Sequence, residues 1–228
     1  MLMKRLVLTV TFLWSLLAGS PASAHSQVEF ITNYGNFVIE VYADKAPKTV
    51  ANFLEYVHDG FYHEVLFHRV IDRFIVQAGS FRPDMSQKRS YDPIANESDN
   101  GLKNERGTVA MARGFQPDSA TSEFFINLND NKTLNYYNQE PGLRGYCVFG
   151  RVIRGMEVLD RIAQVPTRVD GKLTDLPVQQ VLIQKAEVLT TPIVAEQPSK
   201  AAATEPEKGK TAKPSRNSKT GKKGKKRG

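Results

Sequence analysis

Cysteine is almost absent from this 228-residue chain, which holds Cys147 alone. A single cysteine excludes an intrachain disulfide and any zinc site built from several thiolates. Cys147 lies in the apolar run Tyr-Cys-Val-Phe-Gly, which favours a small buried hydrophobe over a reactive thiol. The folded part of the chain therefore depends on its hydrophobic core for stability.

Histidine is also scarce, with four residues in the whole chain. His58, His63 and His68 recur every five residues, a spacing that fits neither one face of a helix nor a zinc-ligand pattern. No cysteine or carboxylate cluster accompanies them. We therefore expect no metal site.

No apolar run reaches the roughly 20 residues that a membrane-spanning helix needs. The run of residues 6–18 is shorter, and it lies between Lys4-Arg5 and the small residues of Ala22-Ser23-Ala24. This order is typical of a secretory signal peptide rather than a membrane anchor. We expect residues 1–24 to be removed by cleavage after Ala24, and the mature protein to be periplasmic.

An excess of positive charge is lacking in the central part of the chain, although the formal net charge is +7. Residues 191–228 carry eleven Lys or Arg against three Glu, and Lys4 with Arg5 adds two more charges, so residues 25–190 have a net charge of −3. The composition of residues 191–228 predicts a disordered basic tail. Because the chain carries a secretory signal, we expect no nucleic-acid partner. An anionic envelope surface is one expected partner, and a solubilising tail without a partner is the alternative.

The central part alternates apolar and polar residues in many short segments. Eight segments have the composition of strands, and they are residues 28–33, 37–42, 65–71, 74–78, 108–112, 123–128, 146–153 and 181–189. Two segments have helical periodicity. The first begins near Pro47, with Asp44 as a plausible cap, and ends at Gly60; the second spans residues 156–165 and ends at Pro166.

These elements show no regular βα alternation, so they predict one mainly-β domain over residues 25–190. The expected architecture is a closed or nearly closed antiparallel sheet, in which the last strand pairs with the first and removes the sheet edges. The two helices then cover the ends of the barrel. Ligands are left to bind on an outer face or among the long loops.

The stretch of residues 67–79 contains an arginine among large apolar side chains. Alternation along a strand places Phe67, Arg69 and Ile71 on one face. It places His68 and Val70 on the other. An unpaired buried charge is costly, so Arg69 needs a partner.

Five sequence blocks in order resemble the cyclophilin-type peptidyl-prolyl cis/trans isomerases, in particular the exported bacterial branch. They are FHRVIDRFIVQAG, GTVAMAR, SEFFINL, YCVFGRV and GMEVLDRI, within residues 27–190. The resemblance implies an eight-stranded antiparallel barrel capped by two α-helices. It also implies a monomer without a cofactor, acting on proline-containing polypeptides during the folding of exported proteins.

The resemblance gives Arg69 the role of the catalytic arginine, which stabilises the twisted X-Pro amide by donating to its nitrogen. Gln77 then donates to a substrate carbonyl or holds the guanidinium in place. The positions that match substrate-binding residues are His68, Phe74, Ile75, Gln77, Met111, Ala112, Arg113, Glu123, Phe125, Leu143 and Tyr146. Of the pair Phe124 and Phe125, only one can face the barrel interior.

The sequence departs from the family pattern at several of these positions. Asp72-Arg73 replaces the usual Pro-Gly, and Ile75 replaces a methionine. Glu123 stands where the family has glutamine, and a carboxylate there is expected to pair with Arg69 or Arg113 or to penalise acidic peptides. A tryptophan of the family is missing, with Leu143 the nearest apolar candidate, so cyclosporin is expected to bind weakly. These departures leave open a second function, a chaperone that grips proline-containing segments with little turnover.

Overall fold

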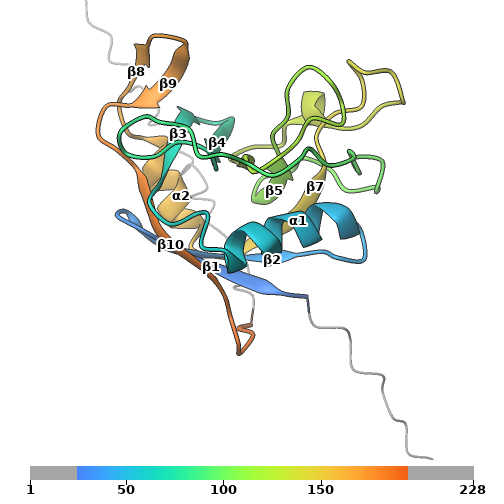
Figure 1. Ribbon diagram of the computed structural model, residues 1–228, viewed down its shortest axis with the longest axis horizontal. Coiled ribbons are helices and arrows are strands. Elements are labelled where there is room, and N and C mark those ends of the chain that lie inside the picture. Colours follow the sequence, from blue (N-terminus) through green and yellow to red (C-terminus); the bar gives the residue numbers. More distant parts are fainter. Residues whose placement is uncertain (1–24, 195–228) are drawn as a thin grey trace, which may run out of the picture. The chain divides into compact units, whose positions relative to one another are not determined.

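The computed structural model describes residues 25–194 (Figure 1). The proposed signal peptide and nearly all of the basic tail lie outside these residues. Within the described part, no helix combines the length and the apolar character that crossing a membrane requires.

Eight antiparallel strands close into a barrel in the order β1-β10-β3-β4-β6-β5-β7-β2. The predicted pairing of the last strand with the first is confirmed, because β10 lies antiparallel to β1 with Phe30 opposite Ala186. The strands are β1 (Gln27–Thr32), β2 (Gly35–Val41), β3 (Val65–Ile71), β4 (Ile75–Ala78), β5 (Thr108–Met111), β6 (Phe124–Asn127), β7 (Val148–Arg154) and β10 (Leu182–Val188).

Aromatic rings fill the barrel interior. Phe30 and Phe37, which face each other across the β1–β2 hairpin, stack with their centroids 4.9 Å apart. Phe53 of the first helix meets Phe149 of β7 at 5.0 Å, so this helix contributes directly to the same core. Phe124 is part of this interior cluster and Phe125 is not, which confirms that the adjacent pair divides between two faces.

Two helices pack on the barrel, α1 (Pro47–His58) and α2 (Met156–Ala163). The expectation that Asp44 caps α1 is wrong, since the N-cap position is Ala46 and no side chain at that position caps the helix. Glu97 supplies the cap from the long loop instead. Its carboxylate accepts from the backbone N–H of Lys48 at 3.1 Å and from that of Thr49 at 2.8 Å. The loop is thereby fastened to the free donors at the start of α1.

Strand β3 does not keep the strict alternation that the sequence suggests. Phe67 is paired with Ala78 and Arg69 with the preceding residue Gln77, so β3 has one extra residue at His68. Such a bulge shifts the faces of the residues that follow it. Phe67 and Val70 therefore both point into the barrel core, and the prediction that Phe67 shares a face with Arg69 is wrong.

A second hairpin, absent from the sequence prediction, follows α2. It consists of β8 (Thr167–Asp170) and β9 (Leu173–Pro177), which form a separate two-stranded sheet. Its β9 strand packs against β3, beside the barrel rather than within it (Figure 1). Leu176 is the buried anchor, at 4% exposed, and it lies near Leu66 and Phe67 of β3. The hairpin thus stands next to the strand that carries Arg69.

Candidate active site

Arg69 and Gln77 lie opposite each other on the adjacent strands β3 and β4. The bulge at His68 takes Arg69 out of the core, and its side chain is 38% exposed. On its other side Arg69 is paired with Asp175 of β9, with Nε 3.6 Å from Oδ2. The guanidinium is therefore flanked by β4 and by the β8–β9 hairpin.

An apolar cluster separate from the barrel core lies beside this arginine. It combines residues from β4, β5, β6 and β7 with partly buried residues from the neighbouring loops. The buried members are Ile75, Ala110, Phe125 and Val148, and the partly buried members are Phe74, Leu102, Ala112, Leu134 and Tyr146. Phe125 is paired with Gln77 across the β4–β6 ladder, and Gln77 with Arg69 across the β3–β4 ladder, so Phe125 lies two strands away from Arg69.

Glu123, the residue before β6, contacts three side chains from β3, β4 and the residues that follow β4. It accepts hydrogen bonds from Gln77 at 2.7 Å and from the Ser80 hydroxyl, and His68 Nε2 lies 3.5 Å from it. Burial raises the pKa of Glu123, but the contacts with His68, Ser80 and Gln77 outweigh burial and lower that pKa overall. Its carboxylate is thus held ionised.

Glu123 pairs with neither arginine that the sequence suggested. Arg69 pairs with Asp175, and Arg113 donates from Nε to the Gly145 carbonyl at 2.9 Å. Arg113 also stacks over the Tyr146 ring at 4.8 Å. Because both arginines are occupied elsewhere, the expected pairing of Glu123 with Arg69 or Arg113 is wrong.

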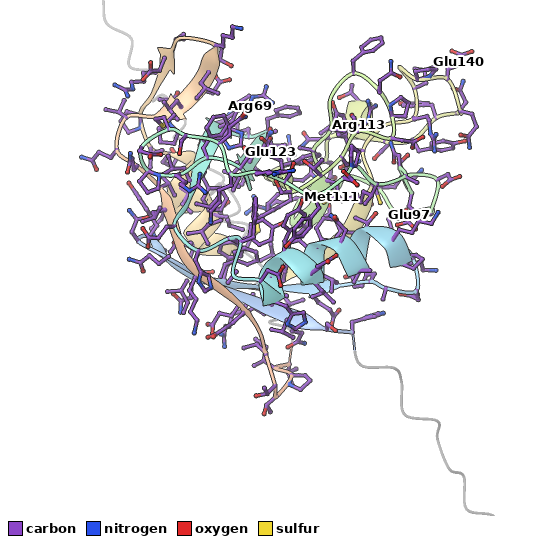
Figure 2. The ribbon with its side chains drawn as sticks, viewed as in Figure 1. Arg69, Glu97, Met111, Arg113, Glu123 and Glu140 are labelled. Atoms are coloured by element: carbon purple, nitrogen blue, oxygen red, sulfur yellow. The ribbon has the colours of Figure 1, made fainter. Side chains whose placement is uncertain are left out.

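The structure brings most of the predicted site residues together and separates two of them. The polar side of the site consists of Arg69, His68, Gln77 and Glu123. The apolar cluster contains Phe74, Ile75, Ala112, Phe125 and Tyr146, with Arg113 packed on Tyr146. Figure 2 labels Arg69, Arg113 and Glu123. Met111 instead belongs to the barrel core and lines a small cavity with Arg113 and Ala120. Leu143 is 42% exposed in a loop and is not part of the cluster.

Five residues of the site were missed from the sequence, and they are Leu102, Ala110, Leu134 and Val148 of the apolar cluster, and Asp175. Leu134 occupies the apolar cluster from the short 3₁₀ turn at Lys132–Leu134, and Asp175 reaches Arg69 from β9. Leu134 is an apolar residue within an Asn-rich loop, which was a usable signal. Asp170-Gly171 between two extended runs is a hairpin signal that would have placed Asp175 on a strand.

Comparison with known proteins decides what this arrangement is. Residues 27–188 match the profile of the family described as cyclophilin type peptidyl-prolyl cis-trans isomerase/CLD. The chain belongs to the cyclophilin family. It is 50% identical over 161 residues to peptidyl-prolyl cis-trans isomerase B of Escherichia coli (strain K12), a match that covers 71% of this cyclophilin and 98% of that protein.

Further relatives agree with this cyclophilin in sequence and in structure. Peptidyl-prolyl cis-trans isomerase A of Dickeya dadantii (strain 3937) is 45% identical over 189 residues, covering 82% of this chain and 98% of its own. A crystal structure of a Cryptosporidium parvum cyclophilin type isomerase superposes with a TM-score of 0.58 at 28% identity, covering 74% of this chain and 99% of its own. The chain is a peptidyl-prolyl cis/trans isomerase, of a family that acts on proline-containing peptides.

The site suits this reaction chemically because isomerisation breaks no covalent bond. The barrier of about 18–20 kcal/mol comes from amide resonance, which is lost when the X-Pro bond twists. An apolar pocket holds the proline ring, and a donor aimed at the prolyl nitrogen favours the twisted amide. Within residues 25–194 no three His, Cys, Asp or Glu residues gather in a way that could hold a metal ion.

Proposed function

We propose that this cyclophilin catalyses proline isomerisation in exported proteins with Arg69 as its catalytic residue. The Ile75–Phe125 apolar cluster holds the proline ring in this proposal. The Arg69 guanidinium donates to the nitrogen of the twisted amide.

The observation that carries the proposal is the position of the accessible Arg69 guanidinium beside an apolar cluster. Arg69 is paired with Gln77, and Gln77 with Phe125, so three adjacent strands carry the donor, the amide and the pocket wall in sequence. A proline ring on Phe125 would therefore lie close to the guanidinium. A related Cryptosporidium parvum structure, 28% identical with a TM-score of 0.56 and covering 72% of this chain and 99% of its own, was determined in the presence of the dipeptide Ala-Pro.

Arg69→Ala tests this role. We expect the variant to lower kcat/KM for a proline tetrapeptide in a protease-coupled assay by more than about tenfold, or about 1.4 kcal/mol. Arg151→Ala is the matched control, because Arg151 is an exposed arginine of β7 whose partner is Glu105. An Arg69→Ala enzyme that is folded and as fast as the control would remove Arg69 from the mechanism.

The proposal that the substrates are exported proteins depends on residues 1–24. The charged start, the apolar run and the Ala-Ser-Ala sequence support removal of a signal peptide. Expression in a bacterial host followed by mass spectrometry of the periplasmic fraction should give a chain that begins at His25. Recovery of the unprocessed chain from the cytoplasm alone would contradict export.

For the basic tail we propose contact with anionic envelope surfaces. Its support is the excess of eleven Lys or Arg over three Glu in residues 191–228, against a mildly acidic domain. The full-length protein is expected to be a monomer in light scattering. It should bind anionic phospholipid vesicles at low salt and dissociate from them at high salt. Binding that survives deletion of residues 192–228 would contradict the role of the tail.

A further inference from the structure

Asp175 is the acidic partner of the proposed catalytic arginine, and it lies outside the barrel on β9. Within residues 25–194 it supplies the one carboxylate that lies within ion-pair distance of Arg69, at 3.6 Å from Nε. We infer that Asp175 is a positioning residue, which holds the Arg69 guanidinium in the orientation that the reaction needs. This inference rests on the proposed catalytic role of Arg69.

The ion pair with Asp175 involves the Nε atom of Arg69 and not its two Nη atoms. Asp175 approaches the Nε side, whereas no hydrogen bond or ion pair of the two Nη groups occurs within residues 25–194. An arginine side chain has several rotatable bonds, and its planar fork directs its donors only when the whole plane is fixed. An anchor at Nε therefore leaves the Nη donors free to meet a prolyl nitrogen while limiting the rotation of the plane.

Stabilisation of the fold does not account for this ion pair. Both side chains are more than one-third exposed, at 38% for Arg69 and 37% for Asp175. Ion pairs as exposed as this contribute little to stability, since water competes for both charges. The effect of Asp175 is thus expected on the orientation of Arg69 rather than on the free energy of unfolding.

The backbone at Asp175 has a left-handed conformation, with a φ of +59°. Glu64, Arg73 and Met85 share this conformation, and aspartate tolerates it better than most residues other than glycine. Here the next residue, Leu176, is buried against the barrel beside β3, and this anchor fixes β9 next to the strand that carries Arg69.

Asp175→Asn is the direct test, because asparagine keeps the size of the side chain and tolerates the left-handed conformation. In the protease-coupled assay on the full-length protein we expect kcat to fall by about fivefold to tenfold, with KM changed by less than about twofold. Asp170→Asn is the matched control, since Asp170 belongs to the same hairpin and pairs with Arg168 at 3.0 Å. We expect the control to stay within about twofold of the wild type. A wild-type rate for Asp175→Asn would overturn the inference.

Two further variants separate a positioning role from a structural one. In an Arg69→Ala background, Asp175→Asn should cause no additional loss, because a residue that acts through Arg69 has nothing left to orient. An equal loss in both backgrounds would overturn the inference.

Asp175→Gly removes the carboxylate and suits the left-handed φ at this position. The variant should therefore fold at least as well as the wild type and still be slow. Full activity of this variant would count against a positioning role. Full activity of Arg69→Ala would contradict the proposed catalytic role of Arg69. A slow Arg69→Ala enzyme together with a fully active Asp175→Asn enzyme would contradict the positioning role of Asp175 alone.

Discussion

Gln77 donates a hydrogen bond from its side-chain Nε2 to Glu123 Oε2 over 2.7 Å. A carboxylate can only accept hydrogen bonds, so Glu123 fixes which end of the Gln77 amide faces it. The Gln77 oxygen is then turned away from Glu123, on the strand that pairs with the strand of Arg69. Within residues 25–194 no hydrogen bond joins Gln77 to Arg69, and the bond to Glu123 leaves Gln77 one further N–H for a substrate carbonyl.

The ionised state of Glu123 predicts a pH dependence of stability. Its folded-state pKa lies below the ordinary value of 4.5, so its contribution is present above that pH and is lost as the pH falls through the folded-state pKa. Between about pH 6 and about pH 3, the free energy of unfolding in urea should fall more for the wild type than for Glu123→Gln. Equal pH slopes for the two proteins would show that the network around Glu123 does not retain the carboxylate in its charged form.

Gly79 lies where β4 leaves the barrel and passes the backbone that precedes β6. A Cβ at this position would lie 2.5 Å from the Ser122 carbonyl oxygen and 2.7 Å from Glu123 Cα, and the φ of Gly79 is +121°. Gly79→Ala should therefore destabilise the protein by about 2 kcal/mol or more, in urea unfolding. Gly142→Ala is the control, since no atom lies within 4 Å of the added Cβ there. A loss as small as that of the control would contradict this close approach.

Glu97 predicts a coupling between the long loop and α1. Glu97→Ala removes the acceptor for the N–H groups of Lys48 and Thr49, and it should lower the free energy of unfolding by about 1 kcal/mol. Glu55→Ala removes the same charge from the exposed side of the same helix and should change stability by less than about 0.5 kcal/mol. Thermal or urea unfolding measures both. Similar values for the two variants would argue against the cap.

Cys147 should be unreactive in the folded protein. Burial raises the pKa of its thiol to about 12, and the residue is 4% exposed. Because the thiolate is the reacting species, alkylation by a thiol reagent at about pH 8 should be on the order of 100-fold slower in the native protein than in urea. Rapid native labelling would place Cys147 at the surface and would contradict the prediction of a buried hydrophobe.

The barrel followed from the sequence because alternation and turn residues mark its strands locally. Two of the predicted strands, residues 65–71 and 74–78, correspond closely to β3 and β4, with a turn at Asp72-Arg73. What alternation cannot reveal is an inserted residue. The bulge at His68 therefore left Phe67 assigned to the wrong face, although Arg69 itself was recognised as the residue in need of a partner.

The site was harder to predict where loops contribute to it. Leu134 rather than Leu143 packs on the apolar cluster, because a loop has no period that relates sequence position to direction. The partner of Arg69 was missed for a related reason. Asp175 is more than one hundred positions away in the chain, and only the packing of β9 on β3 brings the two residues together.

The place of β10 between β1 and β3 has a kinetic consequence. Until residues 182–188 have been synthesised and delivered, β1 and β3 both keep an unpaired edge, and the ring of hydrogen bonds stays open. Contacts between the first and last strands also give the fold a high contact order, which slows folding. Until then the chain has two exposed strand edges that other chains can pair with, and its last strand is the one that removes them.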